Sequence, residues 1–207
     1  MYKMIAGMTA FLAMTGPALA QAQATNFTKA QIDAVLKAGP NAVDHTIQVF
    51  DMGDYAMSVA IIKRDAPKPR PAGAPAPTPR ADAVKCGLTA APAGAKQGPG
   101  GMISHDFTAE TYIVTSGSGT LVTGGQIVNG TRSAPDSDVT EILNGPSCSG
   151  GVVGDIKTQT LTAGDVAVIP AGIPHGWTNI TDQVTYLSVR PDPKKVLKHG
   201  YVNPAIK

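Results

Sequence analysis

The stretch from residue 164 to residue 179, GDVAVIPAGIPHGWTN, contains a histidine whose surroundings favour a chemical role. Val166 and Val168 fall on one face of a strand, and the proline and glycine that follow favour a turn. Pro174 keeps the residue before it extended, so the turn delivers His175 onto a following strand. An imidazole held in this way can bind a divalent metal ion or transfer protons near neutral pH.

The same stretch resembles the second signature motif of the cupin superfamily, in which glycine, proline, glycine, histidine and asparagine recur at fixed spacing. All five positions match, as Gly164, Pro170, Gly172, His175 and Asn179. The resemblance implies an all-β fold, a cupin-type β-barrel known as a double-stranded β-helix or jelly roll. We expect this barrel to be preceded by a short N-terminal helix.

The first cupin motif carries two histidines one residue apart, then a glutamate four or five residues later and a glycine seven beyond that. The segment 103–117 fits this pattern, except that Ile103 takes the place of the first histidine. The resemblance therefore implies three metal ligands, His105, Glu110 and His175. Two histidines and one carboxylate suffice for a catalytic metal with open positions, and they favour iron, manganese or zinc. The alternative is a site without metal, in which the histidine and glutamate hydrogen-bond each other.

We assign the wall of the same pocket to four residues, Ile103, Tyr112, Trp177 and Tyr186. Two of the aromatic residues lie two positions after Glu110 and His175, and this even step keeps them on the same strand faces. A small apolar or planar ligand fits such a wall. Packing in the barrel core is the competing interpretation.

The remaining segments must supply the scaffold. Short β-rich runs separated by Gly, Asn, Pro and Ser predict the barrel core at residues 101–192. Residues 21–64 are predicted to form a helix, opened by Thr28 in a capping box, and then the first strands. Residues 65–100, rich in Pro, Ala and Gly, are predicted to be a loop or insertion, and residues 193–207 a C-terminal tail.

Between the two motifs, residues 117–164 contain many turn-forming residues and are expected to be a long insertion over one mouth of the barrel. The two cysteines, Cys86 and Cys148, are candidates for one disulfide, because an even pair of thiols in an exported protein tends to be bridged. Such a bridge would pin the insertion to the segment that follows the proline tract.

The first twenty residues indicate export. Lys3 precedes an apolar stretch, a Gly-Pro pair breaks any helix, and small residues up to Ala20 suit a cleavage site, so residues 1–20 are predicted to be a signal peptide. A membrane anchor is the alternative, but a span needs about 20 consecutive apolar residues. We expect a periplasmic or secreted protein with no membrane association after cleavage.

The charge balance gives no reason to expect nucleic acid or an anionic membrane as partner. The net charge is +2 for the whole chain, and loss of Lys3 leaves it near neutrality. The resemblance implies a small-molecule ligand and a homodimer. Three functions stay open: a metal-dependent enzyme of oxygenase, isomerase or lyase type, a non-catalytic binding protein without metal, and a structural role in an oligomer.

Overall fold

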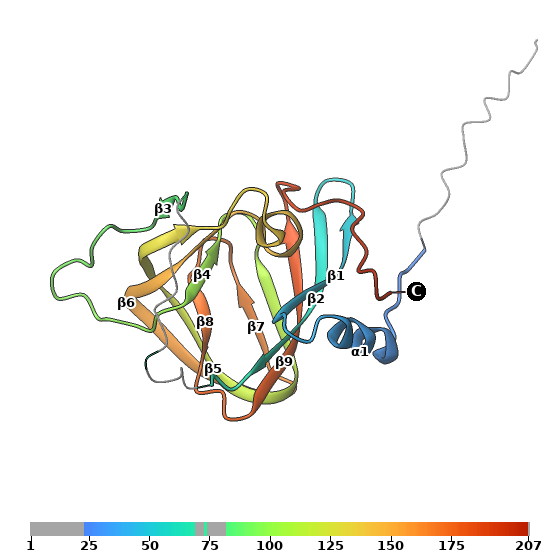
Figure 1. The fold of residues 1–207 in the computed structure, drawn as a ribbon, viewed down its shortest axis with the longest axis horizontal. Coiled ribbons are helices and arrows are strands. Elements are labelled where there is room, and N and C mark those ends of the chain that lie inside the picture. The colour runs from blue at the N-terminus through green and yellow to red at the C-terminus, as the bar shows by residue number, and fades with distance from the viewer. Residues whose placement is uncertain (1–22, 69–72, 74–81, 207) are drawn as a thin grey trace, which may run out of the picture.

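The computed structural model describes residues 23–68, 73 and 82–206 (Figure 1). The predicted signal peptide and most of the proline tract lie outside the described residues. The elements, in chain order, are α1 (Lys29–Ala38), β1 (Asp44–Asp51), β2 (Ala56–Asp65), β3 (Lys85–Cys86), β4 (Met102–His105), β5 (Glu110–Arg132), the π-helical turn η1 (Val139–Leu143), β6 (Ser147–Thr162), β7 (Val166–Ile169), β8 (His175–Thr178) and β9 (Gln183–Asp192). No helix in these ranges is long and apolar enough to cross a membrane.

The strands form a closed antiparallel barrel. Their order is β1-β2-β9-β5-β6-β4-β8, and β8 returns to pair with β5, which closes the sheet. The short strands β3 and β7 also pair with β5. Figure 1 shows the strands wrapping around a common interior, with α1 outside the barrel beside β1 and β2. The prediction of an all-β jelly-roll barrel with a short N-terminal helix is confirmed.

Two long strands replace the insertion that was expected between the motifs. β5 has 23 residues and β6 has 16, and they pair over most of their length. The register shifts between Gly124 and Gln126, where Gly124 and Gly125 both have positive φ. A bulge of this kind bends a strand without ending it. The expected insertion over residues 117–164 is therefore mostly two paired strands, although turns and bends do occur at residues 135–137 and 144–146 between them.

The N-terminal helix begins as its sequence predicts. The Thr28 hydroxyl accepts a hydrogen bond from the Gln31 backbone, and the Gln31 side chain accepts one from the Thr28 backbone. The apolar stripe of α1 packs through Val35 against Ile47 and Ile61, on the outer face of β1 and β2. The helix therefore covers the barrel from outside.

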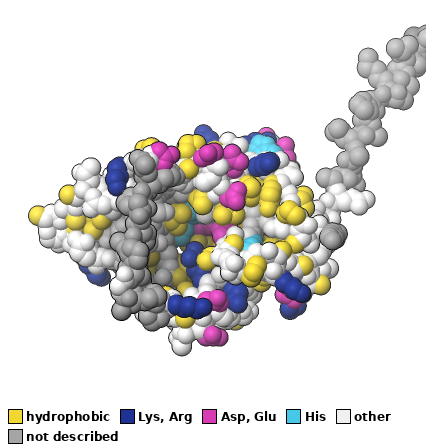
Figure 2. Space-filling view, viewed as in Figure 1, with side chains coloured by type: hydrophobic (Ala, Val, Ile, Leu, Met, Phe, Trp, Pro, Cys, Tyr) yellow, Lys and Arg dark blue, Asp and Glu magenta, His cyan; other side chains and the backbone are white. Residues whose placement is uncertain are grey.

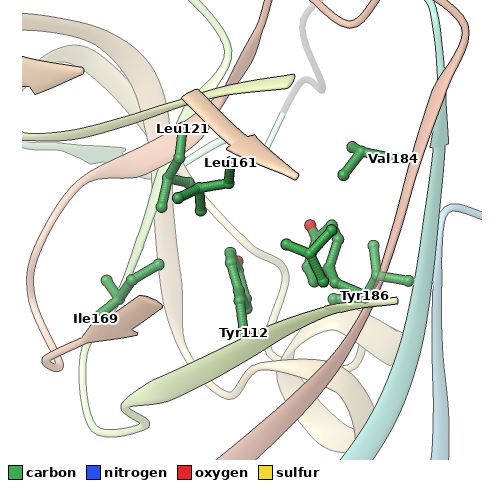
Figure 3. Close-up of a cluster of buried hydrophobic side chains, with 8 residues drawn as sticks. Tyr112, Leu121, Leu161, Ile169, Val184 and Tyr186 are labelled. Atoms are coloured by element: carbon green, nitrogen blue, oxygen red, sulfur yellow. The ribbon is translucent and has the colours of Figure 1, made fainter. Parts of the chain in front are cut away.

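The barrel interior holds the main hydrophobic cluster. Figure 3 shows six of its side chains pointing into the space that the strands enclose: Tyr112, Leu121, Leu161, Ile169, Val184 and Tyr186. They come from strands far apart in the sequence, so their burial holds the barrel closed.

A second cluster contains the disulfide. Cys86 of β3 and Cys148 of β6 are bonded, with their Cα atoms 6.0 Å apart. Cys148 packs with Met102 and Val122 in a cluster separate from the main core. The predicted bridge is confirmed. Inside the segment predicted as a loop, Lys85–Cys86 forms the short strand β3, which pairs with β5.

Candidate metal centre

Three predicted ligands lie together inside the barrel. His105 ends β4, Glu110 begins β5 and His175 begins β8. The Oε2 atom of Glu110 is 3.3 Å from Nε2 of His105 and 2.9 Å from Nε2 of His175. All three side chains are buried, with 2–3% exposure. Among the His, Cys, Asp and Glu side chains of the described residues, these three lie close enough together to hold a metal ion.

The turn after β4 brings Glu110 to the same side as His105. An odd step along a straight strand would place the two on opposite faces, but residues 106–109 leave the sheet between them. The backbone oxygen of His105 accepts a hydrogen bond of 2.7 Å from the backbone of Gly172, which lies in the turn before His175. This hydrogen bond connects the segments of the two motifs beside the candidate ligands.

The hydrogen bonds to the histidines fix their tautomers. Nδ1 of His175 lies 2.9 Å from the carbonyl oxygen of Ile173, which can only accept, so Nδ1 carries the proton. Nδ1 of His105 lies 2.8 Å from the hydroxyl of Ser147. That hydroxyl donates its own hydrogen to the carbonyl of Gly145, so it must accept from His105. In the neutral form, both histidines therefore present an Nε2 lone pair toward Glu110.

This arrangement fits a cation. Two Nε2 lone pairs and the Glu110 carboxylate converge on one point, and three acceptors in contact repel one another unless a metal ion or a proton lies between them. A second hydrogen bond that orients each ligating imidazole is typical of metal sites. The residues present thus suit a divalent metal ion.

The Glu110 carboxylate has further partners on both oxygens. The Tyr112 hydroxyl donates to Oε2 at 2.7 Å, whereas Ser188 and Arg190 donate to Oε1 at 3.0 and 2.8 Å. Burial alone would raise the pKa of Glu110, but the charge of Arg190 beside it holds that pKa well below its usual range. The carboxylate is therefore ionised at neutral pH and available as a ligand.

Two neighbours of Glu110 also have shifted pKa values. Burial lowers the pKa of His105, an effect that Glu110 partly opposes. Burial and the charge of Glu110 raise the pKa of Tyr112 well above its usual value. His105 in its neutral form can coordinate a metal, and Tyr112 remains a hydrogen-bond donor.

Arg190 is a site residue that the sequence reasoning missed. Its side chain is fully buried, and besides Glu110 it donates to the carbonyl of Leu143 at 2.9 Å and to Oδ2 of Asp44 at 2.6 Å. The signal that could have found it is the alternation along β9, where Tyr186, Ser188 and Arg190 share one face. A charged residue in such a series marks a polar position of the interior.

The aromatic residues predicted to form the pocket wall make one contiguous group. The ring of Tyr112 lies 4.4 Å from that of Tyr186 and 6.3 Å from that of Trp177, and 6.1 Å from the imidazole of His175. Both tyrosines are buried and Trp177 is half-buried, with its Nε1 donating to the Tyr186 hydroxyl at 3.1 Å. The group packs in the core next to the candidate ligands, and contact with a bound molecule stays a prediction.

Ile103 lies on the side of β4 that faces the site. It is opposite His175 in the strand register and is half-buried. Its neighbour Met102 packs into the cluster around the disulfide, so by strand alternation Ile103 and His105 share the other face. An apolar side chain therefore stands where the motif usually supplies a fourth ligand.

On the face drawn in Figure 2, histidine, acidic and basic side chains gather near the centre.

The fold and the site together define a jelly-roll barrel protein with a candidate metal centre between its strands. Residues 85–205 match the family model described as Cupin. The match covers more than half of the chain, and the chain belongs to the cupin family. No curated protein matches it.

Solved structures with a similar course of the chain share little sequence with it. BH2720 from Bacillus halodurans is 11% identical with a TM-score of 0.40, covering 88% of this chain and 91% of that one. A conserved protein with a double-stranded beta-helix domain from Klebsiella pneumoniae is 14% identical with a TM-score of 0.40, covering 86% and 92%. Oxalate decarboxylase from Lactobacillus farciminis is 12% identical with a TM-score of 0.29, covering 74% and 34%. Likeness at this level carries no argument about function.

Proposed function

We propose that this protein is an exported cupin that binds one divalent metal ion through His105, Glu110 and His175 and acts on a small molecule. The observation that carries the proposal is the convergence of two Nε2 lone pairs on one oxygen of a buried carboxylate, with both Nδ1 protons already committed elsewhere. Iron, manganese and zinc all suit this ligand set.

The reaction class is oxygenation, isomerisation or elimination by a lyase. When bound, the ion supplies a Lewis acid with positions open to substrate or oxygen. The residues of the chain do the rest: Ser147 and the Ile173 carbonyl orient the two imidazoles, and the Tyr112 hydroxyl provides a donor 2.7 Å from Oε2. Ile103, Trp177 and Tyr186 contribute the apolar and aromatic surroundings that would exclude water around a bound molecule.

A periplasmic or secreted location is part of the proposal. The disulfide between Cys86 and Cys148 supports an oxidising compartment. The signal-like sequence of residues 1–20 supports export. A labelled fusion followed to the periplasm or medium, with N-terminal sequencing of the mature form, tests both points.

A homodimer is supported by an apolar surface on the outer side of β5 and β7. Ile113 pairs with Val166 across these strands, and Ile113, Val166 and Val168 are 36%, 57% and 70% exposed. Contiguous apolar side chains on a surface favour association. Light scattering of the purified protein, compared with a Val168→Lys variant, measures whether this surface holds two copies together.

A non-catalytic binding protein without metal is the second candidate. It is favoured by the 2.9 Å separation of His175 Nε2 from Glu110 Oε2, which is a normal hydrogen-bond length for a protonated histidine. In that case the aromatic group and Ile103 would form the walls of an apolar site.

Elemental analysis separates the two candidates. The mature protein is purified without a metal-binding tag, and His175→Ala is compared with His199→Ala, a matched change at an exposed histidine. About one ion per chain, retained in His199→Ala and lost in a folded His175→Ala, supports the metal protein. No ion in the wild type, and no gain in thermal stability on adding iron, manganese or zinc, supports the metal-free binder.

A further inference from the structure

Arg190 joins two carboxylates inside the barrel. Its Nε donates to Oε1 of Glu110 at 2.8 Å and its Nη2 to Oδ2 of Asp44 at 2.6 Å. The guanidinium is fully buried and the Asp44 side chain is 15% exposed, so water screens these charges little. A buried cation between two anions is costly to assemble unless each partner is in place.

The charge count depends on Asp44. Glu110 and Arg190 alone sum to zero, and a neutral pair next to neutral histidines attracts a divalent cation weakly. Asp44 adds one negative charge on the far side of the guanidinium, so Asp44, Glu110 and Arg190 together sum to −1. Half-buried Arg64, which donates to the Tyr186 hydroxyl, also interacts with Asp44 and offsets part of this charge. Without Asp44, the Arg190 charge would cancel that of Glu110, and an ion at Glu110 would be attracted less strongly.

The two carboxylate oxygens of Glu110 have different hydrogen-bond partners. Ser188 and Arg190 both donate to Oε1, while Oε2 faces the histidines. Arg190 Nε also contacts the Ser188 hydroxyl at 3.1 Å, which ties the two donors together. An oxygen engaged by two donors is a poor second ligand to a metal ion.

We propose that Asp44, Arg190 and Ser188 form a positioning clamp that makes Glu110 a one-oxygen ligand through Oε2, with Asp44 offsetting the positive charge of Arg190 beside the ion. The clamp rests on the proposed function, because it acts on the metal only through Glu110. It also gives β1 a role in the site, since Asp44 belongs to β1 and lies far from both sequence motifs.

The test compares two Asp→Asn changes in the same strand. Asp44 pairs with buried Arg190, whereas Asp51 at the other end of β1 pairs with Lys195 near the surface. Metal-free mature protein is titrated with Co²⁺, by calorimetry for the affinity and by visible absorption for the coordination geometry. We expect Asp44→Asn to bind Co²⁺ about 10–100-fold more weakly, as outer-shell changes do, and Asp51→Asn to match the wild type. Asp44→Glu, which keeps the charge, should recover part of the affinity.

The absorption spectrum reports on the division between the two oxygens. Ser188→Ala removes one of the two donors to Oε1 without changing charge, so Arg190 alone holds Oε1 and we expect altered Co²⁺ bands. If Asp44→Asn fails to fold by circular dichroism, Ser188→Ala decides alone: altered bands support the clamp, and wild-type bands with wild-type affinity overturn it.

Different results reject the metal site and the clamp. A wild type that binds no Co²⁺ rejects the metal site, and the clamp with it. A wild type that binds one ion, together with a folded Asp44→Asn variant that binds it equally well, rejects the clamp and leaves the proposed metal site standing.

Discussion

At the scale of single residues, Glu110 is the centre of the site. Its two oxygens contact two imidazoles, a phenol, a serine hydroxyl and a guanidinium. So many polar contacts around one fully buried carboxylate make its ionised form part of the folded state. Changes at this residue should therefore affect both metal binding and stability.

The pH dependence of stability should show this. The pKa of Glu110 is depressed in the folded protein, so its ionised form contributes stability above the unfolded-state pKa of about 4.5, and this contribution is lost as the pH falls through the lower folded value. We expect urea unfolding of metal-free protein to show a wild-type advantage over Glu110→Gln at pH 7 that shrinks steadily below about pH 4.5. An advantage that is constant between pH 7 and pH 3 would contradict the assignment.

The missing histidine of the first motif can be restored. Ile103 lies opposite His175 and shares a strand face with His105, so Ile103→His places a fourth imidazole beside the three ligands. We expect the variant to bind Zn²⁺ roughly tenfold or more tightly than the wild type, a gain of about 1.4 kcal/mol. Competition against a chelator of known affinity measures it, and Ile103→Val is the control for packing. Equal affinities would mean that Ile103 does not face the ion.

At the scale of elements, the long hairpin of β5 and β6 determines how the barrel bends. Gly117, which lies in β5, and Gly101, which lies just before β4, differ in what surrounds them. An added Cβ at Gly117 would lie 1.9 Å from the backbone oxygen of Gln183, whereas one at Gly101 would meet nothing within 4 Å. Both glycines have nearly the same φ, +72° and +71°.

Alanine substitutions at Gly101 and Gly117 distinguish the cost of backbone strain from the cost of a steric clash. Gly101→Ala should cost only the strain of a positive φ, roughly 1–2 kcal/mol. Gly117→Ala introduces the same strain and must also displace the β9 backbone. We therefore expect a clearly larger loss in the free energy of unfolding. Chemical denaturation of both variants gives the comparison, and equal losses would show that β9 yields at no cost.

At the scale of the whole molecule, the disulfide and the barrel close the fold at different places. The bridge connects β3 to β6 across a separation of 62 residues and packs with Met102 and Val122 in its own cluster. The candidate metal centre lies inside the barrel, with His105 and His175 on β4 and β8. The two regions adjoin at Ser147, which precedes Cys148 and accepts a hydrogen bond from His105, so their separate contributions need a direct comparison.

The bridge should contribute to stability through the unfolded state. For a closed loop of this length the chain-entropy relation gives about 4 kcal/mol. We expect the Cys86→Ser, Cys148→Ser double variant to unfold at lower urea concentration than the wild type while still binding metal at the wild-type affinity. Urea titrations and the Co²⁺ assay together measure both effects; loss of metal affinity in a folded double variant would show that the two regions are coupled.

The sequence by itself determined the elements whose signals are local. The motif around His175, the capped helix at Thr28 and the even steps that link Tyr112 to Glu110 all depend on neighbours within a few residues, and strand and helix periodicity report such relations directly. Family membership and the three candidate ligands followed from the same short stretches.

Only the tertiary structure decided how the long strands bend and which charges are buried. Arg190 reads in the sequence as one more charged strand residue, because its partners Asp44 and Glu110 are 146 and 80 positions away. From the sequence, residues 117–164 were predicted to be a turn-rich insertion. A bulge within a strand and a turn between strands contain similar residues, and only the pairing across the sheet distinguishes them. Contacts between distant segments, which no local spacing encodes, bring these residues to the site.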